Sequence, residues 1–255
     1  MQAILSALHE QHSELDALVD PLDEADWERP TPCEGWTVAD VVLHLAQTDE
    51  LARPSAAGRF AEGLNVLAGG LDRQGNIDDG AAAMVASERG MPNVALLERW
   101  RAGAAELRAT LASSDPHQRV DWVAGQLSVQ TLATTRLAEC WIHTGDVAAA
   151  LGKTQVPTDR LEHVARLAWR TLPYAFARAG RELAGPVVFD LQAPSGARWH
   201  FVPVSEHATE PVTVIEGDGA DLCLVAARRV TPDDTSLRGA GPDAHTVLEL
   251  VRTYA

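Results

Sequence analysis

The segment Glu139–His143 carries the strongest local signal for chemistry in this chain. On a helix, Glu139 and His143 lie four residues apart, so their side chains project from one face, one above the other. A carboxylate oxygen and an imidazole nitrogen at that spacing can bind one metal ion. The same spacing is also typical of a solvated pair on a helix surface, so the pattern by itself leaves both interpretations open.

The residues around this pair are mostly apolar, and the polar side chains gather in a single stripe of Thr135, Glu139, His143 and Asp146. Such a stripe either faces solvent or forms a buried site. Burying it without partners would cost several kcal/mol. A buried stripe therefore requires a metal ion or a closed network of hydrogen bonds.

A third ligand is offered by His44, which lies between Leu43 and Leu45 in a largely apolar segment. A core histidine satisfied by one hydrogen bond would have the same surroundings. Three ligands from two helices, with one position left open for water or substrate, match the pattern of a catalytic zinc site in a helical bundle. The candidate ligand set is His44, Glu139 and His143.

The elements that must position these residues follow from the spacing of apolar residues. This spacing predicts helices over residues 1–20, 38–52, 94–114, 128–151 and 158–179. Thr37 is expected to cap the second of them, with Asp40 completing an acidic version of a capping box, and Gly152 suits the end of the fourth. Residues 54–92 are rich in Gly, Ala and Asp and are expected to hold short helices at most.

The pattern changes towards the C-terminus, where short runs rich in β-branched and aromatic residues predict strands over 186–194, 197–204 and 212–217. Helices are expected over 221–228 and 243–254. We therefore expect a mainly α protein, with a four-helix bundle over residues 1–182 and a small α+β domain over 183–255.

Composition excludes several function classes. The 255 residues carry a formal net charge of −15, which disfavours binding to nucleic acid or to anionic membrane surfaces. Three widely spaced cysteines suggest reduced thiols in a cytoplasm rather than a disulfide framework. The N-terminal segment lacks the features of a signal peptide, and no apolar run is long enough to span a bilayer. We expect a cytoplasmic protein, monomeric or homodimeric.

Residues 22–52 resemble the signature of the N-terminal domain of the mycothiol-dependent maleylpyruvate isomerase family, within the wider DinB-like metal-binding superfamily. The matching elements are Asp26-Trp27, the loop 32–37 and His44-Leu45. Residues 139–152 are similar to a second family motif. The resemblance extends over about residues 1–155, and the C-terminal part is similar to a sterol-carrier-like domain, in a subgroup of actinobacterial metal-binding proteins.

The resemblance implies a divalent metal held by His44, Glu139 and His143, with zinc as the expected ion and nickel as an alternative that such ligands also accept. Asp146 matches an Asp of the family and is expected to support a ligand or the fold rather than to bind the metal. An Arg of the C-terminal domain acts near the metal in the isomerase branch. Arg229, or its neighbour Arg228, is the candidate, although an arginine pairing with a helix C-terminus would look the same.

These features favour an enzyme that activates a low-molecular-weight thiol, with mycothiol as the expected cosubstrate. A metal-bound thiol loses its proton readily, and the thiolate attacks an electrophilic small molecule, giving transfer or isomerisation. One alternative is a hydrolase that uses metal-activated water and a second carboxylate from Asp49, Glu50 or Asp146. A metal-stabilised carrier of an apolar ligand is the other. The thiol of Cys33, where the family often has an apolar residue, is expected to serve packing.

Overall fold

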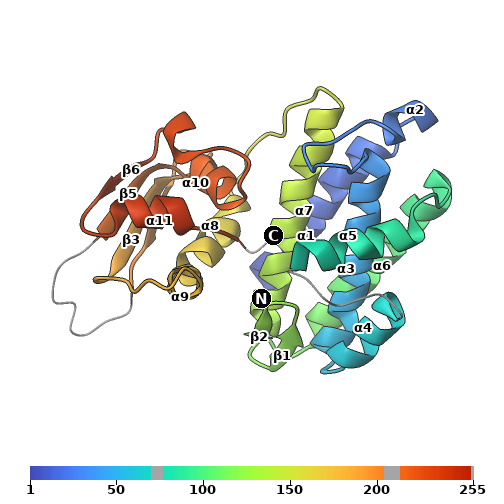
Figure 1. The fold of residues 1–255 in the computed structure, drawn as a ribbon, viewed down its shortest axis with the longest axis horizontal. Helices are drawn as coiled ribbons and strands as arrows, with labels where there is room; N and C mark the ends of the chain where they lie inside the picture. Colours follow the sequence, from blue (N-terminus) through green and yellow to red (C-terminus); the bar gives the residue numbers. More distant parts are fainter. Residues whose placement is uncertain (70–76, 204–212, 254–255) are drawn as a thin grey trace. The chain divides into compact units, whose positions relative to one another are not determined.

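The computed structural model describes residues 1–69, 77–203 and 213–253, which form two compact units, 1–155 and 156–255. The first unit is built mainly from helices, and the second combines helices with a small sheet (Figure 1). The expected mainly α fold with a small α+β C-terminal part is confirmed. Among the described helices, none has the length and apolar character needed to cross a membrane.

Four long helices form the bundle of the first unit: α1 (Gln2–Val19), α3 (Val38–Ala56), α6 (Asn93–Ser113) and α7 (Val129–Ala150). Helices α1 and α3 each pack against both α6 and α7, and Figure 1 shows the four running side by side. Shorter elements complete the unit: α2 (Glu24–Trp27), α4 (Phe60–Ala68), α5 (Ile77–Glu88), β1 (Arg119–Trp122) and β2 (Gly125–Ser128).

Helices α3 and α7 carry the candidate ligands, and local sequence fixes where each begins. The side chain of Thr37 accepts from the amide of Asp40, whose carboxylate accepts from the amide of Thr37, so the expected capping box is confirmed. Ser128 caps α7 by accepting from the amide of Thr131. After α7, Gly152 adopts a positive φ of 68°, as its role at the helix end requires. Both helices are buried over most of their residues.

The strands β1 and β2 pair as an antiparallel hairpin that the sequence analysis did not predict. Val120 and Trp122 of β1 are buried and alternate with exposed residues, as expected for a strand with one covered face. The hairpin turns at Val123 and Ala124, and Gly125, which begins β2, adopts a φ of 110° that other residues rarely adopt. The hairpin leads directly into α7, and β1 packs against α3 and α7.

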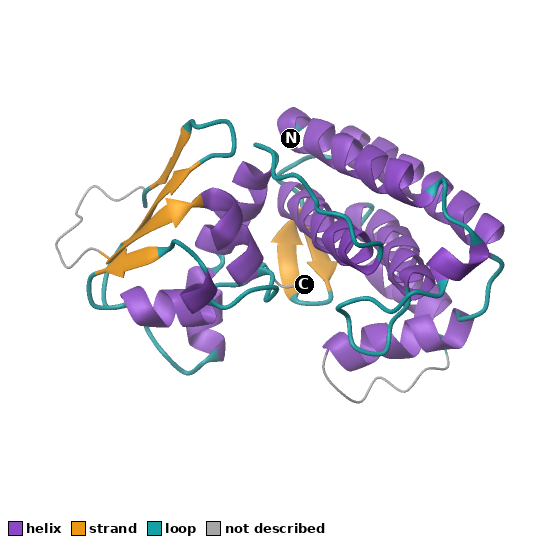
Figure 2. Cartoon of the chain, turned by 90° about the horizontal axis from the view of Figure 1, so that it is seen from above, coloured by secondary structure: helices purple, strands orange, loops and turns teal. Residues whose placement is uncertain are grey.

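The second unit contains a four-stranded sheet in the order β4-β3-β5-β6, with β3 and β5 parallel and the other pairs antiparallel. Its strands form one layer with the helices beside it (Figure 2). The elements of this unit are α8 (Leu161–Arg170), α9 (Leu172–Arg178), β3 (Val187–Gln192), β4 (Arg198–Phe201), β5 (Thr213–Asp218), α10 (Gly219–Ala226), a 3-10 turn (Pro232–Asp234), β6 (Arg238–Ala240) and α11 (Ala244–Leu250).

The units divide between residues 155 and 156, whereas the sequence analysis placed the boundary between 182 and 183. The helix expected over 158–179 is broken into α8 and α9, because Pro173 has no amide proton to continue the helical hydrogen bonds. Helix α8 packs against α10 and β4 of the second unit, and the indole of Trp169 donates to the carbonyl of Val187. Residues 204, 212 and 254, at the ends of expected elements, lie outside the described residues.

Candidate metal centre

The three candidate ligands come together inside the bundle, His44 from α3 and Glu139 and His143 from α7. All three residues are buried, with exposed fractions of 7%, 9% and 7%. The polar stripe of α7 therefore does not face solvent at these positions. The helical spacing of four places Glu139 and His143 on one face of α7, and the packing of α3 on α7 brings His44 to them.

The distances within the set suit a shared cation. Nε2 of His44 lies 3.4 Å from Oε2 of Glu139, and Nε2 of His143 lies 3.7 Å from the same oxygen. The two imidazole rings meet edge to face, with centroids 5.0 Å apart. Ligands bound at about 2.1 Å in tetrahedral geometry are about 3.4 Å from each other. Both imidazole nitrogens thus lie at about this separation from the carboxylate oxygen, and all three donor atoms lie within 4.8 Å of one another.

The protonation of the set also suits a metal. Burial lowers the pKa of His44, although a hydrogen bond with Glu139 opposes this effect, so the imidazole is neutral. Burial by itself would raise the pKa of Glu139, but the hydrogen bond with His44 and the positive charge of Arg136 lower it to about 2. A neutral imidazole and an ionised carboxylate are the forms that coordinate metals.

The set does not form a closed hydrogen-bond network. The buried Nδ1 of His44 has no hydrogen-bond partner among the described residues, and Nε2 of both histidines faces a single carboxylate oxygen. A buried polar stripe requires either a closed network or a metal ion. Nε2 of His143 lies 3.7 Å from Oε2 of Glu139, which is too far for a hydrogen bond, so the network is open where a cation would bind, and this favours the metal. The donor set of two imidazoles and one carboxylate is typical of zinc sites.

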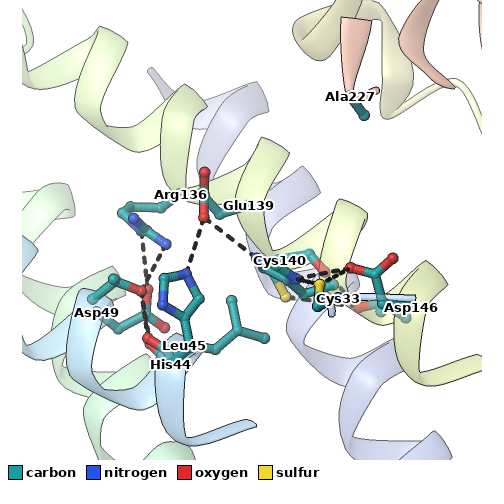
Figure 3. A network of polar contacts seen from close by, with 12 residues as sticks. Cys33, His44, Leu45, Asp49, Arg136, Glu139, Cys140, Asp146 and Ala227 are labelled. Carbon is teal, nitrogen blue, oxygen red and sulfur yellow. Dashed lines mark hydrogen bonds and ion pairs between the residues drawn. The ribbon is translucent and has the colours of Figure 1, made fainter. Parts of the chain in front are cut away.

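Asp146 supports the set from the next turn of α7. Its Oδ2 lies 2.9 Å from Nδ1 of His143, the ring nitrogen that does not face Glu139. A carboxylate in this position holds the imidazole in one orientation and in the tautomer that leaves Nε2 free to coordinate a metal. Figure 3 shows Asp146 on the same side of α7 as Cys33, away from His44.

The loop before α3 covers the histidines. A β-bridge between Pro30 and Thr37 closes this loop. The half-buried indole of Trp36 packs on both imidazoles, with its centroid 5.0 Å from that of His44 and 6.4 Å from that of His143. From the same loop, the thiol of Cys33 donates to Oδ2 of Asp146 over 3.2 Å. Sequence analysis expected this thiol to serve packing, and the structure places it in a polar contact.

A buried ion pair lies beside the ligands. Arg136, one turn before Glu139 on α7, directs its Nε to Oδ1 of Asp49 at 3.2 Å and donates through Nη2 to Thr48 at 3.0 Å (Figure 3). Burial raises the pKa of Asp49 to about 6, even though the charge of Arg136 acts in the opposite direction. The guanidinium also contributes to the low pKa of Glu139. Arg136, rather than the pair as a whole, therefore supplies the positive charge that acts on Glu139 among the candidate ligands.

Comparison with known proteins finds a matching family and two similar proteins. Residues 8–148 match the model of the mycothiol maleylpyruvate isomerase N-terminal domain. An uncharacterized protein of Mycobacterium tuberculosis strain CDC 1551 / Oshkosh and its counterpart in strain ATCC 25618 / H37Rv are each 31% identical to the chain, over 97% of the chain and 93% of their own length.

The chain belongs to the mycothiol maleylpyruvate isomerase family.

Two solved structures are similar to the chain: the mycothiol-dependent maleylpyruvate isomerase and a histidine-to-alanine mutant of it. Each matches with a TM-score of 0.61 and 18% identity, over 94% of the chain and 92% of the solved chain. At this identity the match shows a shared fold. The family match contains all three candidate ligands and Asp146, which lie between residues 8 and 148.

The remaining predicted site residue lies in the other unit. Arg229 follows α10, is exposed, and donates through Nη1 to the carbonyl of Ala227 at 3.0 Å. Its role in this member of the mycothiol maleylpyruvate isomerase family stays a prediction, as does the alternative role of its neighbour Arg228, which adopts a φ of 60°.

Sequence reasoning missed the contacts of Cys33 and Trp36 and the pair of Asp49 with Arg136. The position of Arg136 three residues before Glu139 was a usable signal, since it places both on one face of a buried helix. The loop contacts had no such signal, because no helical or strand period relates residues 33 and 36 to His143.

Proposed function

We propose that this chain is a cytoplasmic metal-dependent enzyme that activates a low-molecular-weight thiol, mycothiol, for transfer to an electrophilic small molecule or for its isomerisation. The observation that carries the proposal is the buried set of His44, Glu139 and His143, whose donor atoms lie at metal-ligand separations in an open hydrogen-bond network. The thiol is inferred from the family, whose name includes mycothiol, and from the similar solved isomerase.

The residues of the set would hold one divalent cation, expected to be zinc, with nickel as the alternative. When bound, the cation would stabilise a thiolate, so that a thiol loses its proton near neutral pH. Ionised Glu139 and neutral His44 are already in the forms that coordinate metals. The carboxylate of Asp146 is proposed to accept a hydrogen bond from Nδ1–H of His143. This bond orients the ring so that Nε2 points towards the other ligands.

The loop 30–37 shields the ligands, because the indole of Trp36 lies against both imidazoles. Excluding water there strengthens the electrostatic interactions of the set and protects a reactive thiolate. Arg229 is proposed to bind a carboxylate of the substrate, a role to which a guanidinium is suited by its paired donors.

A hydrolase that uses metal-activated water needs a further carboxylate as general base, and the sequence offers three. Each of them is engaged elsewhere: Asp49 pairs with Arg136, Glu50 with Arg99, and Asp146 with His143. These contacts favour thiol activation over hydrolysis.

A carrier of apolar ligands would need an apolar cavity. The cavity described in the C-terminal unit, about 580 Å³ in volume, is bordered by charged side chains that include Asp190, Arg198 and Glu216. Its lining is unsuited to an apolar ligand, which favours the enzyme over the carrier.

The test combines metal analysis with thiol consumption. The purified protein is expected to contain about one metal ion per chain and to consume mycothiol in the presence of maleylpyruvate or a bimane electrophile. His143→Ala is expected to lose both properties, whereas His9→Ala, which removes an exposed histidine of α1, is expected to keep them. Metal-loaded protein that consumes no thiol with any electrophile in a panel would refute the proposed reaction.

A further inference from the structure

The loop between α2 and α3 presents a cysteine to the metal centre from a fixed backbone. The hydroxyl of Thr31 accepts from the amide of Cys33 at 3.2 Å, and the amide of Trp36 donates to the carbonyl of Cys33 at 3.0 Å. Thr31 is tied in turn to the carbonyl of Trp36 through both its amide and its hydroxyl, each at 2.9 Å. These hydrogen bonds fix the backbone of the loop at Cys33, and with it the point from which the thiol extends.

The thiol of Cys33 is connected through Asp146 to His143, one of the candidate metal ligands. Sγ of Cys33 donates to Oδ2 of Asp146 over 3.2 Å, and the same oxygen lies 2.9 Å from Nδ1 of His143. Nε2 of His143 then faces Glu139. One carboxylate oxygen thus joins the loop to the imidazole.

We propose that Cys33 is a positioning residue of the metal centre: its S–H holds Oδ2 of Asp146 against Nδ1 of His143. The proposal rests on the proposed function, since the centre it serves is the one formed by the three ligands. A carboxylate can rotate about its last bond, and a second donor restricts that rotation. Because Asp146 sets the orientation of the imidazole, fixing Asp146 prepares His143 to bind metal at lower entropic cost.

Cys33, His143 and Asp146 offer an alternative to this hydrogen-bonded arrangement, because they could themselves bind a cation. Sγ of Cys33, Nδ1 of His143 and Oδ2 of Asp146 lie within 3.9 Å of one another and could hold a cation themselves. Such a cation would share the imidazole of His143 with the ion of the first set. Two dications on one imidazole repel each other strongly, so we favour the hydrogen-bonded arrangement.

The experiment compares Cys33→Ser, which keeps a donor, with Cys33→Val, which fills the space without one. Zinc affinity is measured by competition with a chromophoric chelator, in thiol-free buffer and with circular dichroism as a check of folding. We expect Cys33→Val to bind zinc about tenfold more weakly, the lower end of the effect of such supporting partners, and Cys33→Ser to stay within about threefold of wild type. Cys223→Ala, a buried cysteine of the other unit, is the matched control and should leave the affinity unchanged.

Wild-type affinity in Cys33→Val, or equal weakening in both variants, would overturn the proposal. So would a wild-type protein that binds two zinc ions per chain and loses one in Cys33→Ser, since the thiol would then be a ligand.

If the wild type binds no zinc, the proposed function fails, and the role of Cys33 is decided on the metal-free protein by ¹⁵N NMR of the histidine rings. A single Nδ1–H tautomer of His143 in wild type and Cys33→Ser, with a mixture in Cys33→Val, would support positioning. The same tautomer in all three proteins would overturn it.

Discussion

Replacing Arg136 by Met removes the positive charge from the core of the bundle and tests how the buried pair supports the fold. Arg136 and Asp49 are each 2% exposed, and their contact is 3.2 Å long. Burial already raises the pKa of Asp49 to about 6 in the presence of the guanidinium. Without Arg136, the carboxyl group loses its ion-pair partner in the core and is left with the weaker effect of the charge of Arg108.

The expected loss of stability follows from the geometry. Two unit charges about 4 Å apart at an effective dielectric of about 20 interact by about 4 kcal/mol. Removing one partner of a buried pair costs about 3–5 kcal/mol, because the other charge remains desolvated. Arg136→Met should therefore lower the free energy of unfolding of the bundle by about 3–5 kcal/mol. The double variant Asp49→Leu, Arg136→Met should recover most of this loss, since neither charge is then buried alone.

The assay is native-state hydrogen exchange on the metal-free protein, which reports the free energy of opening at the amides of α3 and α7. Amides of the C-terminal unit in the same sample serve as the internal control. Arg136→Lys, which keeps the charge but not the paired donors, should fall between wild type and Arg136→Met. If the double variant is as unstable as the sum of the two single variants, the pair has no coupling and the reasoning is refuted.

Three further predictions concern pH, the metal and the capping of α3. Burial and the charge of Arg108 lower the pKa of His12 to about 3. At this residue the unfolded chain binds more protons than the folded chain between about pH 3 and 6.5, so His12 contributes stability that rises with pH, opposite in sign to the contribution of Asp49. His12→Gln should remove the His12 contribution, so that its stability relative to wild type decreases as pH rises through this window in urea titrations at several pH values. Asp146→Asn, which disturbs the hold on His143, should weaken zinc binding by about 10–100-fold in chelator competition; unchanged affinity would exclude the supporting role. Thr37→Ala removes a cap and should cost about 1 kcal/mol by hydrogen exchange in α3.

Much of the bundle could be predicted because its long helices bury continuous faces. The apolar spacing around His44 and Glu139 marked α3 and α7, and Thr37, Asp40 and Gly152 marked their ends. The hairpin over 119–128 was not predicted because each of its strands has four residues, too few to show a clear alternation of apolar and polar side chains. The boundary between the units was misplaced because the amphipathic pattern of α8 shows that one face of the helix is buried. The pattern does not show whether that face packs on the bundle or on the C-terminal sheet and helices.

The grouping of the candidate site residues was predictable where the helix period relates them. Glu139, His143 and Asp146 lie on one face of α7. His44 could be added because it is a histidine in the middle of a second, largely apolar helix. The roles of loop residues were not predictable in this way. Cys33 reaches Asp146 through the hydrogen bonds that close its own loop, and such tertiary contacts between a loop and a helix leave no regular spacing in the sequence.

The most direct measurement is X-ray absorption at the zinc edge on protein purified with its metal in thiol-free buffer. Coordination by His44, Glu139 and His143 predicts a first shell of nitrogen and oxygen alone, at about 2.0–2.2 Å, with the outer scattering of two imidazoles. Loss of that shell in Glu139→Gln would agree with this assignment. A sulfur scatterer at about 2.3 Å, or protein that holds no zinc after loading, would contradict it.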